Sequence, residues 1–315
     1  MPGPTLAGLL AAAVVRWAVV CWGVDVTAPP CPEPRPEPVE LRDVAVHLAT
    51  TAAELVRRRR EEVFGHDATG ARTAAAGSTA TKTTETDPVT VVDTESERLL
   101  RAELARLRPD DAVLGEEDGG DPADTAGLRW VLDPVDGTVN FLYGLPVYAV
   151  SVGVQRDGVS VAGAVVDVPA GRVFAAARGA GATLDGRPLR CTGATRARLS
   201  LVATGFAYDA DRRARQGALL AALLPHVRDV RRAGSAALDL CSVAAGWVDA
   251  YYEHGTNPWD WAAGSLIAEE AGAVLRLPGA SALSAAGQLV LAAAPGVHAE
   301  LAALLARHTP EGLQH

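Results

Sequence analysis

Two carboxylates, Asp133 and Asp136, stand three residues apart at the end of the apolar run 130–132. Pro134 between them fixes a local turn and leaves the carbonyl group of Val135 free to point the same way as the acids. Closely spaced hard oxygen donors of this kind are the ligands that Mg²⁺ and Mn²⁺ prefer. The segment therefore predicts part of a divalent-cation site.

The next two residues, Gly137 and Thr138, indicate a phosphate site beside these ligands. Gly137 has no side chain to prevent close approach of its backbone to a ligand. A helix predicted to begin at Thr138 would direct unpaired N–H groups and the positive end of its dipole toward an anion. Cations and phosphate would then meet at one junction.

Acids also stand at the ends of three further predicted elements. Asp93 follows residues 89–92, Glu116 follows residues 112–115, and Asp260 opens an apolar helix. If these ends converge, they form an all-oxygen site without His or Cys, which favours Mg²⁺ or Mn²⁺ over Zn²⁺. Mutual repulsion would raise the pKa values of the acids until cations bind. The acids concerned are Asp93, Glu116, Asp133, Asp136 and Asp260.

Each feature has a simpler explanation when it is taken alone. An acid at a helix start, such as Asp93 or Asp260, usually caps the helix. The acidic run 116–118 alone indicates an exposed loop, and an Asp-Pro-x-Asp-Gly stretch alone is often only a turn. Lys82 alone is an ordinary solvated lysine. Capping does not account for acids at four separate element ends, so the combination favours a metal site.

Hydrophobic periodicity predicts a mixed α/β fold with layered sheets. We expect a helix over residues 40–63, a flexible loop over 65–88, and a strand over 89–92 before a helix capped by Asp93 or Thr94. Strands are predicted at 112–115, 129–133, 147–155, 159–167 and 172–177, with a hairpin turn at Asp185-Gly186. The C-terminal half is predicted to alternate strands at 199–204, 228–231, 248–253 and 288–294 with helices at 212–224, 235–246, 259–273 and beyond 294.

The composition excludes several classes of protein. A formal net charge of -9 and a pI near 5.3 argue against nucleic-acid binding, which requires a basic face. The four cysteines show neither paired spacing nor an adjacent His, so neither a zinc site nor a disulfide framework is indicated. We expect a cytoplasmic protein that acts on a small molecule.

The N-terminal segment requires separate treatment. Residues 5–26 are mostly apolar, but their only basic residue, Arg16, lies mid-run, where it suits neither a signal peptide nor a bilayer. A Pro-rich stretch at 28–40 follows. We expect a disordered extension over 1–38, with a weak membrane segment or a signal peptide as alternatives, and a catalytic domain over 39–315.

Five motifs resemble those of the inositol monophosphatase family, a branch of the lithium-sensitive, magnesium-dependent phosphatases. They occur in the family's order, and the resemblance extends from about residue 40 to the end. It implies a five-layer αβαβα sandwich, assembled as a homodimer, with two or three Mg²⁺ ions per site. The motifs are residues 87–93, 115–118, 130–141, 234–237 and 259–264.

The resemblance also implies roles for individual residues. Glu116 and Thr138 would orient the attacking water, and Asp93 would act through water or a weaker third ion. Gly137 and Thr138 would hold the phosphate during direct in-line displacement, without a covalent phosphoenzyme, and Lys82 would lie nearby. The implied ligands of the first two metals are Glu116, Asp133, the Val135 carbonyl, Asp136 and Asp260.

The substrate is indicated by fewer residues. Glu253 matches the position whose carboxylate accepts hydrogen bonds from inositol hydroxyls. Arg231 and Arg232 could face either solvent or substrate, and solvent or a structural role is favoured. We predict hydrolysis of inositol monophosphate; alternatives are fructose bisphosphate, histidinol phosphate, a 3′-phosphonucleotide, or a protein-binding role with the transcription machinery. The implied substrate contacts are Gly137, Thr138, Gly234, Ser235, Ala236, Glu253 and Asp260.

Overall fold

The computed structural model of the chain describes residues 37–63, 65, 79–82 and 88–313. The expectations for the N-terminal extension fall almost wholly outside these residues. Glu37–His315 form one compact unit. Within the described residues, no helix is long and apolar enough to cross a membrane.

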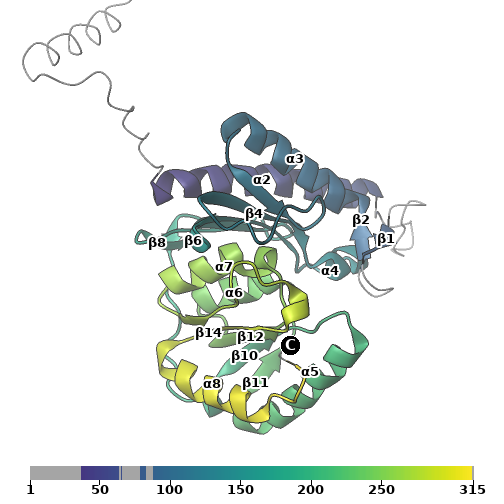
Figure 1. Ribbon diagram of the computed structural model, residues 1–315. Coiled ribbons are helices and arrows are strands. Elements are labelled where there is room, and N and C mark those ends of the chain that lie inside the picture. The colour runs from purple at the N-terminus through teal and green to yellow at the C-terminus, as the bar shows by residue number, and fades with distance from the viewer. Residues whose placement is uncertain (1–36, 64, 66–78, 83–87, 314–315) are drawn as a thin grey trace, which may run out of the picture. The chain divides into compact units, whose positions relative to one another are not determined.

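This unit is built from five layers (Figure 1), as the sequence predicted. An outer helix layer, a seven-stranded sheet, a central helix layer, a five-stranded sheet and a second outer helix layer follow one another. The first outer layer is α2 (Pro38–Val63) and α3 (Val91–Leu107), the central layer is α6 (Ala236–Ala244) and α7 (Pro258–Glu270), and the last is α5 (Ala210–Leu223) and α8 (Pro295–His308).

The seven-stranded sheet runs in the order β3-β4-β5-β6-β7-β8-β9. Only the β3–β4 pair is parallel; the other pairs are antiparallel. Because helices cover both faces, β4 and β5 are buried almost throughout and form near-continuous apolar runs. The strands are β3 (Ala112–Gly115), β4 (Leu128–Asp136), β5 (Ala149–Arg156), β6 (Val159–Asp167), β7 (Arg172–Ala177), β8 (Gly181–Leu184) and β9 (Arg187–Pro188).

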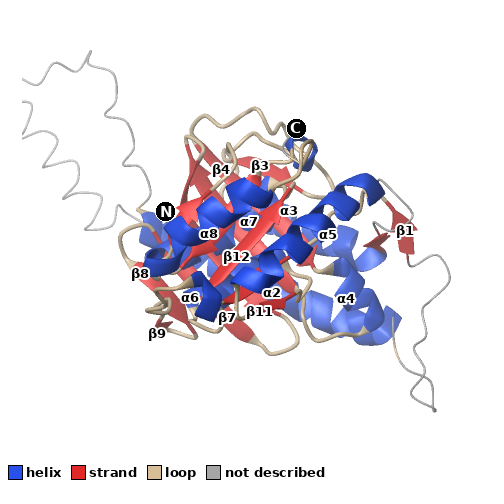
Figure 2. Cartoon of the chain, turned by 90° about the horizontal axis from the view of Figure 1, so that it is seen from below, coloured by secondary structure: helices blue, strands red, loops and turns tan. Residues whose placement is uncertain are grey.

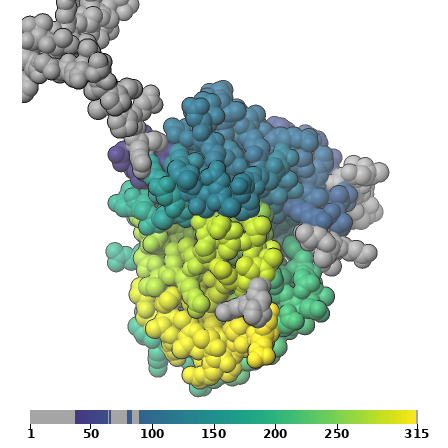
Figure 3. All heavy atoms as spheres, viewed as in Figure 1, coloured from purple at the N-terminus to yellow at the C-terminus, as the bar shows by residue number. Residues whose placement is uncertain are grey.

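The five-stranded sheet runs in the order β11-β10-β12-β14-β13, with α5 and α8 on its outer face (Figure 2). β10 is parallel to β11 and β12, and β14 is antiparallel to its neighbours. In the space-filling view the blue seven-stranded half and the yellow-green five-stranded half are in continuous contact (Figure 3). The strands are β10 (Leu201–Thr204), β11 (Asp229–Arg231), β12 (Ala250–His254), β13 (Val274–Arg276) and β14 (Leu289–Ala293).

The shorter elements lie between these layers in the sequence. A two-stranded antiparallel ribbon pairs β1 (Thr79–Thr81) with β2 (Pro88–Thr90), so the predicted flexible loop over 65–88 is wrong at residues 79–81 and at residue 88. β13 was not predicted. The remaining elements are the short helix α4 (Thr138–Tyr143) and the 3-10 helices Ala197–Leu199, Leu224–His226 and Ser284–Ala286.

The start of α3 differs from the prediction. The helix begins at Val91, so residues 91–92 are helical and not extended, and Thr90 is the N-cap in place of Asp93 or Thr94. Thr90 Oγ1 accepts hydrogen bonds from the N–H groups of Val92 and Asp93, and the Asp93 carboxylate accepts the Thr90 N–H. This reciprocal capping box outweighs the strand preference of two consecutive valines.

Two other local predictions need correction. β4 was expected to end near Asp133, but it continues through Asp136 with a register shift between the two acids, the kind of irregularity at which a proline is tolerated. Asn257, not Asp260, caps α7, and Asp260 occupies the third helical position of that capping box. Asp136 therefore lies beside irregular backbone geometry, and Asp260 lies where the N–H groups of a helix start are free.

The central helix α7 packs unusually close to its neighbours because glycines face it. A Cβ atom added at Gly153 of β5 would lie 2.8 Å from Ala262 Cβ, and one added at Gly163 of β6 would lie 2.9 Å from Ala263 Cα. Toward α6, a Cβ atom at Gly264 would lie 2.9 Å from Leu240 Cβ. These contacts are closer than any larger side chain permits.

The substitution Gly163→Ala tests this packing. The added methyl group would meet helix backbone, which cannot move alone, so we expect the free energy of unfolding to fall by about 1–3 kcal/mol in urea titrations. The control is Gly217→Ala on the exposed side of α5, where nothing lies within 4 Å. There alanine should be neutral or stabilise by up to about 1 kcal/mol, and equal destabilisation by both variants would contradict the packing argument.

Candidate active site

A cavity of about 570 Å³ lies at the junction of the two sheets and the central helix layer. It is lined by all but one of the site residues predicted from the sequence; the exception is Asp93, which is fully buried. Within the part of the chain that the structure describes, no His or Cys lines the cavity. The predicted residues brought together there are Lys82, Glu116, Asp133, Val135, Asp136, Gly137, Thr138, Gly234, Ser235, Ala236, Glu253 and Asp260.

Asp136 is held by the start of α6. Its Oδ2 atom accepts hydrogen bonds from Ser235 Oγ at 2.6 Å and from the Ala237 N–H at 2.7 Å. Ser235 is also the N-cap of α6, because its hydroxyl accepts the Leu238 N–H. Burial raises the pKa of Asp136 to about 6, although these hydrogen bonds act in the opposite direction. The helix start therefore orients this carboxylate across the cavity.

Asp133 and Asp260 are each held through one oxygen. Asp133 Oδ1 accepts the Val135 N–H at 3.1 Å, and Asp260 Oδ2 accepts the Asn257 N–H at 2.7 Å. The second oxygen of each carboxylate accepts no hydrogen bond from any residue that the structure describes. Burial, and then the negative charge of Glu116, raises the pKa of both residues well above the usual value for Asp. Their charges are thus left uncompensated within the described protein.

Asp93 lies beneath the cavity and acts on it through Thr138. Thr138 Oγ1 lies 2.9 Å from Asp93 Oδ1 and 3.0 Å from the carbonyl oxygen of Val135, and it can donate to either. Thr90 also donates a short hydrogen bond to Asp93 through its hydroxyl. Burial raises the pKa of Asp93 to about 6, against the opposing effect of Thr90. With its proton directed to these acceptors, the Thr138 oxygen is free to accept a hydrogen bond from a ligand.

A buried glutamate and a half-buried arginine on α3 position the loop that carries Glu116. Glu97, fully inaccessible to solvent, accepts the N–H groups of Glu117 at 2.7 Å and Asp118 at 3.0 Å. Arg101 donates to Glu97 and also to the carbonyl of Gly119. A side chain at Gly115 would overlap the Glu97 carboxylate. Gly115, the residue before Glu116, is therefore required by the buried Glu97, which lies 18 residues earlier in the sequence.

Lys82 bridges the two glutamates at this edge of the cavity. Its ammonium group lies 2.8 Å from Glu116 and 2.6 Å from Glu117. Burial lowers the pKa of Lys82, but the two carboxylates outweigh burial and raise that pKa above its usual value. Burial and the charge of Glu116 raise the pKa of Glu117 to about 7. The lysine is thus a fixed cation at the acidic end and not a solvated surface residue.

Glu253 and Arg232 lie in the half of the cavity supplied by the five-stranded sheet. Tyr251 donates a hydrogen bond of 2.9 Å to Glu253 Oε2, and burial raises the pKa of Glu253 to about 7 against this hydrogen bond. Arg232 is exposed, as expected, and it also lines the cavity. Arg231 lies at the surface as well, paired with Asp229 at 2.6 Å.

The donor chemistry fits a divalent cation that prefers oxygen. Among the described residues, no group of three or more His, Cys, Asp or Glu side chains is arranged to hold a metal ion as it stands. However, four carboxylates and one carbonyl line the cavity, and Asp133 and Asp260 each keep one oxygen without a hydrogen bond from the described chain. Mg²⁺ or Mn²⁺ would supply the positive charge that these groups lack.

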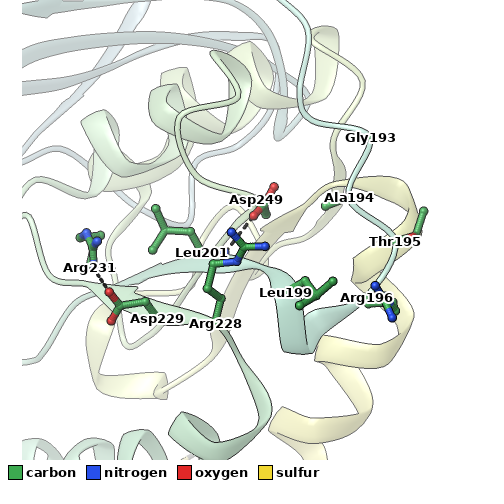
Figure 4. A pocket seen from close by; sticks show the side chains of 10 residues that line it. All are labelled: Gly193, Ala194, Thr195, Arg196, Leu199, Leu201, Arg228, Asp229, Arg231 and Asp249. Carbon is green, nitrogen blue, oxygen red and sulfur yellow. Dashed lines mark hydrogen bonds and ion pairs between the residues drawn. The ribbon is translucent and has the colours of Figure 1, made fainter.

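A second cavity of about 640 Å³ lies beside β10 and β11 (Figure 4). Its acids already have partners: Asp249 accepts from Thr192 and from the Leu201 N–H, and Asp229 pairs with Arg231. Asp229 and Asp249 are the acids among the described residues that line it, so no larger acidic cluster is seen in that part of the chain. The acid-lined cavity is therefore the candidate active site.

Comparison with known proteins agrees with this fold. Its relatives define the chain as a phosphoric monoester hydrolase. The chain belongs to the inositol monophosphatase family, whose model matches residues 37–311.

Individual relatives resemble the chain over most of its length. An inositol-1-monophosphatase of Mycobacterium leprae is 58% identical over 283 residues, covering 87% of this chain and 96% of the relative. The solved structure of Mycobacterium tuberculosis SuhB has 51% identity and a TM-score of 0.72, covering 88% of this chain and 99% of that one. A protein named Nus factor SuhB from Pasteurella multocida is 39% identical over 68% of this chain and 81% of its own length.

Several cavity and supporting residues were missed in the sequence. Glu97 and Arg101 have the spacing of an ordinary surface ion pair on a helix, and only the adjacent Gly115 gave a hint that something packs there. Asp239 follows Ser235 by one helical turn and lines the cavity, but on its own it resembles any polar helix residue. Arg212 also lines the cavity, where it donates to the carbonyl groups of residues 284 and 285.

The substitution Glu97→Gln tests the support of the Glu116 loop. A glutamine offers one acceptor oxygen where the carboxylate uses two, so a buried N–H loses its partner and the free energy of unfolding should fall by about 1–3 kcal/mol. Phosphate release should fall as well, because Glu116 is displaced. Glu103→Gln, on the same helix but with surface partners only, should change stability by less than about 1 kcal/mol. Unchanged stability and activity in Glu97→Gln would show that the pair does not position the loop.

Proposed function

We propose that this chain hydrolyses an inositol monophosphate to inositol and phosphate in a reaction that depends on Mg²⁺. The observation that carries this proposal is the convergence of four carboxylates and the Val135 carbonyl on one cavity, with no His or Cys among the described residues that line it. The carboxylates are those of Glu116, Asp133, Asp136 and Asp260. These groups would hold two or three Mg²⁺ ions, the number that the family resemblance implies.

The protein's own groups prepare the attack by water. Thr138 donates its proton to Asp93 or to the Val135 carbonyl, so its oxygen can accept a hydrogen bond from a water molecule. Glu116, which follows the neighbouring parallel strand β3, provides a second acceptor for that water. Bound Mg²⁺ would lower the pKa of the water and stabilise charge on the phosphate and the leaving oxygen. A water oriented by two acceptors attacks phosphorus in line with the leaving group.

The phosphate itself would lie against Gly137 and Thr138. Gly137 has a φ of 95°, a left-handed conformation that favours glycine, and it is the N-cap of α4. A Cβ atom there would lie 3.0 Å from the Val147 carbonyl oxygen and 3.1 Å from that of Gly234. Glycine at this position thus allows the end of β4 to lie close to the loop before α6. The proposed phosphate site would then lie beside Asp136.

The choice of inositol monophosphate rests on Glu253 and on the relatives named inositol-1-monophosphatase. A carboxylate fixed by Tyr251 can accept hydrogen bonds from hydroxyl groups of the leaving alcohol. A second candidate function is protein binding in transcription, which is favoured by the resemblance to a relative named Nus factor SuhB. The two functions do not exclude each other, since the acids of the cavity are all present.

Phosphate release from a panel of esters tests the proposed function. We expect the wild type to hydrolyse inositol monophosphate in preference to fructose bisphosphate, histidinol phosphate and phosphoadenosine phosphate, and only with Mg²⁺ or Mn²⁺. Asp136→Asn should lower kcat/KM by at least about 100-fold, and Mg²⁺ should no longer raise its Tm. The control Asp229→Asn, in the second cavity, should change neither. If the wild type hydrolyses no ester with any metal, the catalytic proposal fails and the binding role becomes the one to test.

The substitution Thr138→Val tests the orientation of water. It removes the hydroxyl group with little change in shape, so kcat should fall by about 100-fold while KM for the ester changes little. Thr138→Ser keeps the hydroxyl and should retain activity within about tenfold. Equal activity of the valine and serine variants would contradict a role for the Thr138 oxygen, and a change confined to KM would make it a substrate contact instead.

A further inference from the structure

In the half of the cavity supplied by the five-stranded sheet, two charged residues have no role in the sequence motifs or in orienting the attacking water. Arg232 lies in the connection between β11 and α6, and Asp239 lies on α6. Both line the cavity together with Glu253 from β12. The inference about their role rests on the proposed function, because that role concerns the alcohol part of the same ester.

Glu253 has a fixed position in this group. Tyr251, two residues earlier on the same strand, donates to its Oε2 atom. Gly205, directly after β10, leaves the space that the carboxylate occupies, since a Cβ atom there would overlap it. The carboxylate therefore lies between the Tyr251 hydroxyl and the Gly205 backbone, and both contacts hold it at the cavity.

Arg232 folds back over its own turn toward the cavity. A Cβ atom at Gly234 would lie 2.5 Å from Arg232 Nη1, so the absence of a side chain at Gly234 makes room for the guanidinium group. Gly234 has a φ of 100°, a conformation that favours glycine for a second reason. Arg232 makes no ion pair with any described residue. Its donors thus remain available to a ligand.

Asp239 is only 4% exposed and accepts no hydrogen bond from the described residues. Burial, and then the charge of Glu253, raises the pKa of Asp239 well above its usual value, whereas the charge of Arg232 lowers it. A buried polar group without a partner costs free energy. A ligand that donates a hydrogen bond to Asp239 would recover that cost.

We propose that Arg232 and Asp239 are specificity-determining residues that, together with Glu253, recognise the hydroxyl groups of an uncharged polyol leaving group. Arg232 donates to hydroxyl oxygens, and the two acids accept from hydroxyl protons. A polyol satisfies all three, because each hydroxyl both donates and accepts. An apolar leaving group satisfies none of them, and sites built to hydrogen-bond a hydroxyl discriminate strongly against analogues that lack it.

The same residues disfavour a leaving group that carries a second phosphate. Asp209, Asp239 and Glu253 line this half of the cavity against the guanidinium groups of Arg212 and Arg232. Arg212 is already engaged by the carbonyl groups of Ser284 and Ala285. With more carboxylates than guanidinium groups, this wall lacks the positive charge that a second phosphate needs.

Steady-state kinetics of Arg232→Ala test the proposal with two esters, an inositol monophosphate and p-nitrophenyl phosphate, whose leaving group has no hydroxyl groups besides the one released. Loss of charged hydrogen bonds should lower kcat/KM for the inositol ester by about 10- to 100-fold, mainly through KM. The value for p-nitrophenyl phosphate should change by less than about threefold. Arg232→Lys should restore part of the loss. The matched control Arg231→Ala, which removes the neighbouring surface arginine, should leave both esters unaffected.

A parallel loss for both esters in Arg232→Ala would overturn the proposal, since it would assign Arg232 a structural or general catalytic role; no loss for either would overturn it too. Asp239→Asn should lower the ratio of kcat/KM for the inositol ester to that for fructose bisphosphate, and an unchanged ratio would contradict the charge argument.

Calorimetric titration with a non-hydrolysable phosphonate analogue of inositol monophosphate separates this proposal from the catalytic one. Weaker binding to Arg232→Ala than to Arg231→Ala supports recognition even if the wild type hydrolyses no ester, and equal binding refutes it.

Discussion

The close contact between α7 and the seven-stranded sheet is the constraint on which the site depends. Gly153 and Gly163 let the backbone of α7 approach β5 and β6, and Gly264 lets α6 approach α7. Because α6 and α7 both begin at the cavity, their distance from β4 determines how near Ser235 and Asp260 come to the acids of that strand. Larger residues in the central layer would move whole helices, and with them the ends that hold the carboxylates.

Gathering these acids works against stability, and the fold offsets the cost in a consistent way. Asp133 and Asp260 each receive one backbone N–H, and Asp136 receives an N–H and a hydroxyl on a single oxygen. Such hydrogen bonds favour the charged form and orient the carboxylate. They do not neutralise it, so the remaining repulsion favours binding of cations. The site is therefore organised by the protein, and bound cations would balance its remaining negative charge.

Much of the site could be predicted because its residues lie at element ends, where sequence patterns are clear. Asp133, Asp136 and Asp260 follow or open apolar runs, and the structure brings them together as expected. The details of capping could not be predicted, because Thr90, Asp93 and Thr94 are all good cap residues within five positions and the valines between them favour a strand. The position of Glu97 depends on Gly115, which is far away in sequence, and the position of Arg232 depends on the turn that contains Gly234. Neither arrangement has a local sequence pattern.

The two halves of the cavity contribute different properties. The seven-stranded half supplies Glu116, Asp133 and Asp136 from strand ends buried on both faces, where any change disturbs the packing of a helix layer. The five-stranded half supplies Arg232 from a connection and Glu253 from a strand, and under the proposed function these residues face the alcohol part of the ester. Metal binding and leaving-group recognition would then be separable in this fold, because substitutions on the second side need not alter the distances among the acids. Such a separation would let one set of metal-binding motifs serve esters of different alcohols, and the motifs alone would not distinguish among them.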